Sequence, residues 1–314
     1  MTASTLSIGI DVGGTKIAAG LVDPATGERS GERIVPTPER GSDILKTCAH
    51  LAAALIAEAP RRVGSIGIGI PEIVDPGGRP VSGERVDFRT LEVAAAFAGM
   101  PPAMLESDVR AAARGEARFG AGTAFRHWVY VSIGTGISSA IVTDGEPMVG
   151  ARGAALVLAS GAISFTCPEC HGVHRFTLEE TASGPVMAAR WADVHEHPTA
   201  TTHDAINAAM SGRQGAECIV LPAIATLGGA IGWLVNVTDP EAVILGGGLG
   251  TAGGWWGENL EAAIREHIWY PPARGMPIMA AGLGAAAGWV GAAVTAAGRP
   301  APSPGEEAPS PTAR

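Results

Sequence analysis

Apolar residues recur along the first third of the chain with the spacings of short strands and amphipathic helices. Alternation or an unbroken apolar run indicates a strand, and spacings of three and four residues indicate a helix. Strands are expected at 6–10, 16–22, 33–35, 63–70 and 103–106, and helices at 42–59 and 109–119. Ser42 is the expected N-cap of the first of these helices.

The rest of the chain has the same mixture with longer helices. Strands are expected at 128–133, 139–143 and 242–245, and helices at 185–194, 203–210, 217–237, 256–267 and 285–297. Strands followed by helices in both parts predict an α/β protein. Residues 299–314 are rich in Pro, Ser, Ala and Glu and have no apolar face, so we expect this tail to be disordered.

Two uncharged stretches have the length of a membrane span. Residues 218–238 contain Pro222 and Asn236, and residues 275–298 consist mostly of Ala and Gly. Neither stretch has the Leu, Ile and Phe content or the flanking basic and aromatic residues of a transmembrane helix. We therefore expect buried helices of a protein that does not enter the membrane.

The charge balance is acidic, since 22 basic and 31 acidic residues give a formal net charge of −9. An excess of negative charge argues against bulk electrostatic binding of nucleic acid or of an anionic membrane. The N-terminus has no basic region and no apolar signal core, and four cysteines in 314 residues do not form a disulfide framework. A cytoplasmic location is the expectation.

Three glycine-bearing turns, at 11–15, 134–136 and 246–250, each follow an apolar strand. Glycine accepts positive φ and lets backbone N–H groups approach a phosphate without a Cβ in the way. The first two turns also contain Thr15 and Thr135, whose hydroxyls can bond phosphate oxygens. Neither the P-loop nor the Rossmann pattern is present. A single tight turn needs glycine for steric reasons, but three such turns together favour a nucleotide site.

These turns, Asp108 and the segment Asp-Pro-Glu-Ala-Val-Ile-Leu-Gly-Gly-Gly at 239–248 have a recognisable spacing. From about Ile8 to Ala297 the sequence resembles the ROK family (repressor, open reading frame, kinase), which contains bacterial sugar kinases and related regulators. The resemblance implies two ribonuclease-H-like (actin/hexokinase-like) α/β domains with a ligand cleft between them. A small domain would comprise residues 1–118 and 284–298, and a large domain residues 119–283. ATP, Mg²⁺ and a homodimer are also implied.

The resemblance assigns the catalytic and nucleotide-binding residues. Asp108 matches the family's catalytic aspartate, which accepts the proton of the attacking sugar hydroxyl in phosphoryl transfer. A helix N-cap is the structural alternative for Asp108. Asp11 would position Mg²⁺ through water. The nucleotide would be bound by Gly13, Gly14, Thr15, Lys16, Thr135, Gly136, Gly247 and Gly248.

The substrate side departs from the family pattern. The usual Asn-Asp-x-Asn is Ser-Asp-Val-Arg at 107–110, and the usual Glu-x-Gly-His is Val-Leu-Ala-Ser at 157–160. The Pro-Asn loop that reaches the sugar is replaced by Gly-Glu-Arg-Val-Asp at 83–87. Glu179 keeps a family sugar contact. The predicted substrate-binding residues are Ser107, Glu179, Arg85, Asp87, Ser138 and Ser160.

A pocket altered in this way should bind a standard hexose poorly, because each buried polar group left unpaired costs about 1–3 kcal/mol. The first hypothesis is an ATP-dependent kinase of a primary hydroxyl on an amino sugar or C7 cyclitol, since ROK-like kinases act on kanosamine and valiolone-type cyclitols. The alternatives are a glucokinase-type hexose kinase and a catalytically weak sugar sensor or regulator. Retention of Asp108 and of the phosphate turns favours a kinase.

The family's zinc element, Cys-x-Cys-x4-Cys with a distant His, is also altered. Here the segment is Cys-Pro-Glu-Cys-His-Gly-Val-His at 167–174, with Thr177 at the position of the last Cys. This spacing fits a structural, tetrahedral zinc site. Its ligands would come from Cys167, Cys170, His171 and His174. The alternative is that these residues bind no metal, as is common for surface His and buried Cys.

Overall fold

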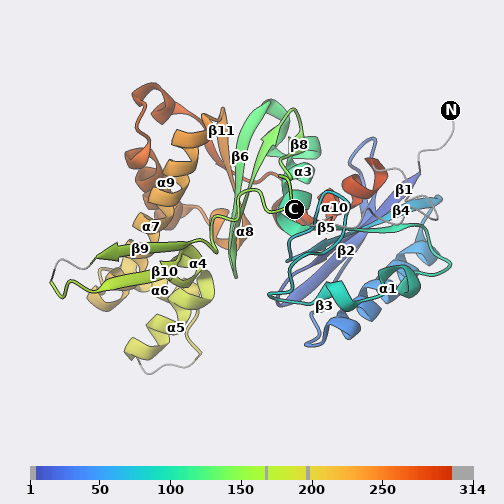
Figure 1. Ribbon diagram of the computed structural model, residues 1–314, viewed down its shortest axis with the longest axis horizontal. Helices are drawn as coiled ribbons and strands as arrows, with labels where there is room; N and C mark the ends of the chain where they lie inside the picture. Colours follow the sequence, from blue (N-terminus) through green and yellow to red (C-terminus); the bar gives the residue numbers. More distant parts are fainter. Residues whose placement is uncertain (1–4, 167–168, 196–198, 299–314) are drawn as a thin grey trace, which may run out of the picture.

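Two five-stranded mixed sheets, one in each of two lobes, organise the chain in the computed structural model, which describes residues 5–166, 169–195 and 199–298 (Figure 1). The first sheet, in the order β3-β2-β1-β4-β5, consists of β1 (Leu6–Val12), β2 (Lys16–Val22), β3 (Arg29–Pro36), β4 (Val63–Ile70) and β5 (Ala103–Ser107). The second, in the order β8-β7-β6-β11-β12, consists of β6 (His127–Ile133), β7 (Ile137–Thr143), β8 (Glu146–Pro147), β11 (Ala242–Gly246) and β12 (Ile278–Ala280).

The two sheets repeat one topology. In each, antiparallel strands joined by hairpins are followed by two strands that add in parallel, so that β1 and β6 occupy equivalent positions. The turns after β1 and β6 are therefore equivalent as well. Since β1, β4 and β5 run parallel, their carboxyl ends meet at one edge of the first sheet.

Helices cover both faces of the first sheet. The apolar side of α1 (Gly41–Glu58) packs against one face, and α10 (Ala287–Gly298) lies on the other. A Cβ at Gly9 would lie 1.6 Å from the carbonyl oxygen of Trp289, and one at Gly67 would lie 1.8 Å from that of Ala292. The backbone of α10 therefore rests directly on the sheet, which only glycine permits at these two positions.

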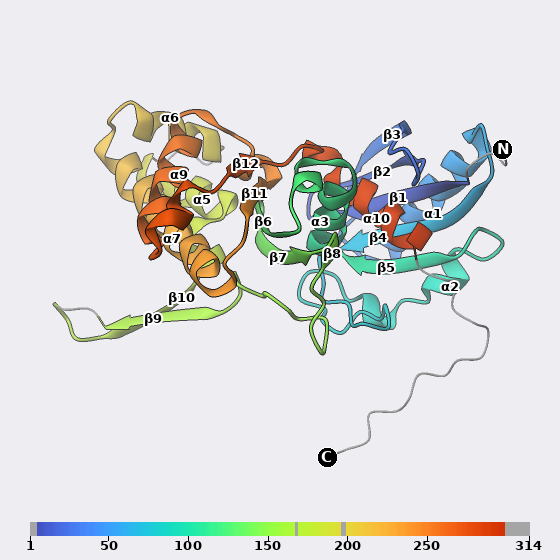
Figure 2. The ribbon, with the colours of Figure 1, turned by 90° about the horizontal axis from the view of Figure 1, so that it is seen from above.

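The helix α3 (Asp108–Phe119) lies between the lobes and packs against α10 and β7 (Figure 2). Its buried Arg110 forms an ion pair with Glu106 in the first lobe. The same guanidinium donates to the carbonyl oxygens of Val74 and Gly153, at 2.6 and 2.7 Å. Because Gly153 follows the second-lobe strands β6 to β8 in the chain, Arg110 ties the two lobes together.

The second lobe is mainly helical outside its sheet. Its helices are α4 (Leu178–Ala182), α5 (Gly184–His195), α6 (Thr202–Met210), α7 (Gln214–Thr238), α8 (Gly247–Gly250) and α9 (Gly254–His267). A hairpin of β9 (Ala162–Thr166) and β10 (Val173–Thr177) projects from the lobe (Figure 2). By length and composition α7 is apolar enough to cross a membrane, but 56% of its most apolar window is buried, as in the core helix of a folded domain.

Most expected strands and helices form, and the differences are local. The first helix begins at Gly41 with Arg40 as its N-cap, so the prediction of a Ser42 cap is wrong. The glycine segment after β11 contains the short helix α8, and the stretch 275–298 is divided among several short elements and α10. The β9–β10 hairpin had no counterpart among the expected elements.

Candidate active site

Two aspartates stand at the carboxyl ends of parallel strands in the first sheet. Asp11 lies near the end of β1, and Asp108 follows β5 as the first residue of α3. At the end of β4, a Cβ on Gly69 would lie 3.5 Å from Asp11 Oδ1 and 3.6 Å from Asp108 Cα. Because ligands of open α/β sheets bind beyond the carboxyl ends of the strands, this edge is the candidate active site.

Both carboxyl groups are partly buried and hold a proton more tightly than usual. Burial raises the pKa of Asp11 to about 6, although the charge of Lys16 opposes the rise. Burial first, and then the negative charges of Asp11 and Glu72, raise the pKa of Asp108 to about 7. A carboxyl group that titrates near neutrality can accept and release a proton, as a general base requires.

The helix cap considered for Asp108 is not formed. Ser107 is the N-cap residue of α3, and Asp108 Oδ1 accepts from the N–H of Val109 at 2.6 Å. A capping side chain would instead accept from an N–H two or three positions ahead. The capping alternative is therefore wrong, and this side chain is not used to start the helix.

The start of α10 approaches Asp11 closely. A Cβ on Gly288 would lie 2.3 Å from Asp11 Oδ2 and 2.4 Å from the carboxyl carbon. Any larger residue at this position would displace the carboxylate. Gly288 is therefore part of the site because it leaves room for the Asp11 carboxylate.

The two hairpin turns predicted to bind phosphate come from different lobes and lie close together. Each is closed by a backbone hydrogen bond, donated by Gly13 in the first turn and by Gly134 in the second. A Cβ on Gly14 would lie 4.0 Å from Thr135 Cγ2. The turns of the two lobes thus face each other closely enough for one polyphosphate to lie against both.

The third glycine segment lies beside the second turn. Gly247 has a φ of 75°, and its Cβ would lie 2.4 Å from the carbonyl oxygen of Ile133, so packing alone requires glycine there. Gly248 is exposed, with no described atom within 4 Å of its Cβ position. Its nitrogen is 3.6 Å from the Cβ position of Gly134. Gly248 therefore leaves the surface beside the turn at 134–136 uncovered by side chains.

Glu179 joins the lobes at the second turn. It lies in the first turn of α4, where Thr177 and Glu180 form a reciprocal capping box that fixes the start of the helix. Its Oε2 accepts from the N–H of Ile137 at 3.1 Å, and its Oε1 forms an ion pair with Arg85 of the first lobe. The structure thus brings together two of the predicted substrate residues, Arg85 and Glu179.

The model of the ROK family matches residues 7–299, which is nearly the whole chain. The chain belongs to the ROK family. This ROK protein is 30% identical over 304 residues to the glucokinase of Streptomyces coelicolor, covering 89% of this chain and 93% of that one. It is 28% identical over 288 residues to the N-acetylmannosamine kinase of Yersinia pseudotuberculosis, covering 87% and 92%.

Solved structures of the ROK family have the same fold. A glucokinase from Streptomyces griseus in complex with glucose and AMPPNP matches with a TM-score of 0.77 and 26% identity, covering 93% of this chain and 99% of that chain. The ROK hexokinase from Thermus thermophilus matches with a TM-score of 0.76 and 30% identity, covering 93% and 98%. The family and the two α/β domains expected from the sequence are confirmed.

The other predicted substrate residues of this ROK protein lie on four separate segments of the chain. Ser107 is buried at the end of β5. The carboxylate of Asp87 is engaged locally, because it bonds the Arg89 guanidinium and backbone N–H. Ser138 is partly buried in β7, and Ser160 is exposed before β9.

Three of the four predicted zinc ligands of this ROK protein, Cys170, His171 and His174, lie near the tip of the β9–β10 hairpin. Cys170 Sγ and His174 Nε2 are 3.6 Å apart, and His171 between them has a φ of 55°. Cys167 falls outside the described residues. Within the described ranges no group of three or more His, Cys, Asp or Glu side chains gathers to hold a metal. Thr177, at the position of the family's last Cys, caps α4 instead.

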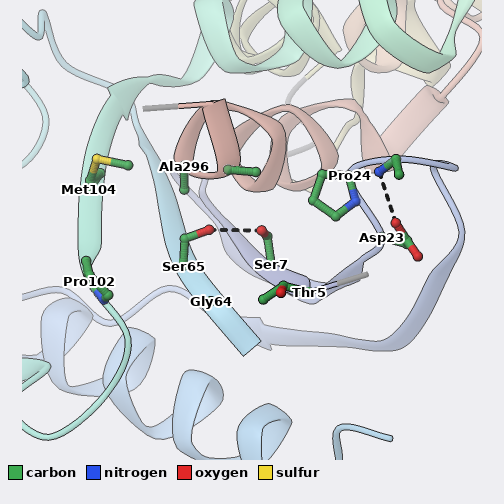
Figure 3. Close-up of a pocket in the computed structure, with 11 residues that line it drawn as sticks. Thr5, Ser7, Asp23, Pro24, Gly64, Ser65, Pro102, Met104 and Ala296 are labelled. Atoms are coloured by element: carbon green, nitrogen blue, oxygen red, sulfur yellow. Dashed lines mark hydrogen bonds between the residues drawn. The ribbon is translucent and has the colours of Figure 1, made fainter. Parts of the chain in front are cut away.

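A cavity of about 500 Å³ opens at the opposite end of the first sheet (Figure 3). The Ser7 and Ser65 hydroxyls, which bond each other at 2.9 Å, lie in it at the beginnings of β1 and β4. Asp11 is four residues further along β1, a distance of about 13 Å at the rise of a strand. This cavity is therefore separate from the candidate active site.

Sequence reasoning missed three residues of the site: Gly69, Glu72 and Gly288. The two glycines occur in Gly-rich or Ala-rich segments, where nothing in the pattern marks a close approach. Glu72 lies between the strands expected at 63–70 and 103–106, in a stretch for which no strand or helix was expected. Its position after an apolar strand and Pro71 was the available signal.

Proposed function

We propose that this ROK protein is an ATP-dependent kinase that phosphorylates the primary hydroxyl of a hexose-like substrate, with Asp108 as general base. The observation that carries the proposal is the Asp108 carboxyl group, whose pKa of about 7 suits proton transfer, at the strand edge beside Asp11. The nearby turns of both lobes would supply backbone N–H groups to the phosphates of a nucleotide. Catalysis of phosphoryl transfer consists largely of such positioning and charge neutralisation.

The residues at this edge fit a magnesium nucleotide. Asp11 and Asp108 are neighbouring carboxyl groups whose pKa values are raised, so a divalent cation near them would offset their repulsion. Asp11 would hold Mg²⁺ through water, and the turns at 13–15 and 134–136 would hold the phosphates. When bound, Mg²⁺ neutralises charge on the transferred phosphoryl group.

The substrate proposed is an amino sugar or a C7 cyclitol. The residues at 157–160 provide no carboxylate or imidazole, and the loop at 83–87 presents Arg85 toward Glu179. Such a pocket differs from one made for glucose. A glucokinase-type activity is the second candidate, because the glucokinase of Streptomyces coelicolor is 30% identical. A weakly catalytic sugar sensor is the third.

An ADP-release assay with MgATP tests these candidates. The acceptors are glucose, N-acetylmannosamine, free amino sugars and C7 cyclitols, and Asp108→Asn serves as the control variant. We expect the highest kcat/KM with an amino sugar or cyclitol, and a loss of about 100-fold or more in the variant. No turnover with any acceptor, or undiminished turnover in Asp108→Asn, would refute the mechanism.

For this protein we propose domain boundaries at 118/119 and 283/284 and a cytoplasmic location. We also propose a homodimer that forms through an apolar patch of Trp233, Val237, Trp269 and Tyr270, all exposed. Asn236 of α7 bonds the backbone N–H of Trp269 and the carbonyl of His267, which keeps the patch together.

Light scattering tests the dimer. Trp269 is 81% exposed, so Trp269→Glu should give a monomer without loss of folding. Val173→Glu, on the exposed β10, is the matched control and should leave the mass unchanged. A wild-type monomer would contradict the proposal.

The proposed zinc site would be formed by Cys170 and His174 together with Cys167 and His171. The 3.6 Å approach of Cys170 Sγ and His174 Nε2 supports it, since both atoms are zinc donors. The role would be structural, stiffening the hairpin that leads to Glu179.

A further inference from the structure

Glu72 is a buried acidic residue just beyond β4, and its carboxylate is surrounded by hydrogen-bond donors from one loop. We propose that Glu72 is a positioning residue for substrate binding. It fixes the loop 82–86, here called the substrate loop, and thereby sets the place of Arg85 against Glu179. The proposal rests on the proposed sugar kinase function and identifies a residue that shapes its acceptor pocket.

Four donors of the substrate loop converge on the one carboxylate. Oε1 accepts from the backbone N–H groups of Arg85 and Val86, at 2.7 and 2.8 Å. Oε2 accepts from the N–H of Glu84 at 3.0 Å and from the Ser82 hydroxyl at 2.5 Å. A carboxylate has about four acceptor sites and no donor when ionised, so it matches this set of donors.

The Ser82 hydroxyl also connects the substrate loop to the residues that directly follow β4. Its Oγ accepts from the N–H of Ile73 at 2.8 Å while donating to Glu72. The segment that follows β4 is thus joined to the substrate loop by the buried Glu72 carboxylate and by the Ser82 hydroxyl. Successive N–H groups that point to one anion hold a loop in a single conformation.

The substrate loop in turn reaches the other lobe. Arg85 forms its ion pair with Glu179, and Glu179 accepts from the N–H of Ile137 beside the second phosphate turn. The Arg85 and Glu179 side chains are 56% and 27% exposed, so both remain accessible to a ligand. A continuous series of bonds therefore leads from Glu72 to the pocket residue Glu179. Displacing the loop should change acceptor binding more than nucleotide binding.

The substitution Glu72→Gln tests this with little change in shape. Glutamine keeps one acceptor oxygen, but its NH₂ group would face N–H donors, so about half of the bonds are lost. Asp75→Asn is the matched control. Asp75 is a second buried carboxylate in the same segment, and it bonds the Arg79 backbone and guanidinium within its own turn.

Hydrogen exchange of the ligand-free protein gives the first readout. In Glu72→Gln the amides of residues 84–86 should exchange at least about tenfold faster, as expected for the loss of bonds to a charged group. In Asp75→Asn their exchange should match the wild type. Unchanged exchange of these amides in Glu72→Gln would overturn the proposal.

Steady-state kinetics with the best acceptor give the second readout. At pH 8.5, where Asp108 is ionised with or without the charge of Glu72, the KM for the acceptor should rise about tenfold in Glu72→Gln, while kcat and the KM for MgATP stay within about twofold. Arg85→Ala should raise the acceptor KM by a similar factor. The acceptor KM of the double variant should be close to that of either single variant, because both changes disturb the same contact between Arg85 and Glu179. Equal KM values in wild type and Glu72→Gln, or a parallel rise in the KM for MgATP, would refute the positioning role. A wild-type protein without turnover would instead refute the kinase assignment.

Discussion

Replacing Asp108 by Asn should remove catalysis and at the same time stabilise the folded protein at neutral and alkaline pH. The usual pKa of an Asp side chain is 3.8, whereas burial and the charge of Asp11 raise that of Asp108 to about 7. Between these values the folded state binds more protons than the unfolded state. The stability of the wild type therefore falls as the pH rises through this range.

The magnitude follows from the two pKa values. At 1.36 kcal/mol for each pH unit, ionising Asp108 in the fold costs about 4 kcal/mol at pH 8 and about 1.6 kcal/mol at pH 5. Asparagine carries no charge and avoids this cost. The free energy of unfolding of Asp108→Asn should thus exceed that of the wild type by an amount that grows with pH.

Urea unfolding at pH 5 and pH 8, in EDTA and without nucleotide, measures the difference. Asp87→Asn is the control, because the guanidinium of Arg89 lowers the pKa of Asp87, so its removal should bring no gain at pH 8. The reasoning fails if Asp108→Asn is no more stable than the wild type at pH 8, or if its advantage is the same at both pH values. In the wild type, kcat/KM should rise with pH through about 7, as the base becomes ionised.

Three further outcomes are expected. Gly288→Ala would place a Cβ 2.3 Å from Asp11 Oδ2, so kcat/KM for MgATP should fall by about 100-fold; an unchanged value would show that Asp11 does not position the nucleotide. Arg110→Met leaves the buried carboxylate of Glu106 without its main partner, and urea unfolding should show a loss of about 3 kcal/mol or more. Cys170→Ser should abolish stoichiometric zinc in metal analysis of the purified protein, and a wild type without zinc would end that hypothesis.

The sequence identified the parts of the site that depend on residue type in a local pattern. Alternation located β1, an apolar run located β6, and the glycines after these strands marked the turns that lie together in the structure. Asp108 was found through its family spacing. The strands and turns are marked by patterns a few residues long, whereas Asp108 was assigned only through a family spacing that spans most of the chain.

The features that the sequence did not predict depend on contacts between distant segments. The partners of Glu72 are mostly backbone N–H groups, which any residue except proline supplies, so no pattern of side chains marks the substrate loop. Gly288 is required by a carboxylate that is far away in the chain. The β9–β10 hairpin was missed because each of its strands has only five residues, too few for an apolar pattern to stand out from the flanking segments.

The close seating of α10 on the first sheet has a consequence for biosynthesis. Strands β1 to β5 leave the ribosome early, but the helix that covers one face of their sheet is the last described element of the chain. Until residues 287–298 have been made, Gly9 and Gly67 expose bare backbone with no side chains to shield it. The first lobe should therefore complete its folding only after the second lobe has been synthesised, against the usual order in which N-terminal domains fold first. A nascent chain that stops short of α10 would be a substrate for chaperones and proteases, even though every residue of its first sheet is present.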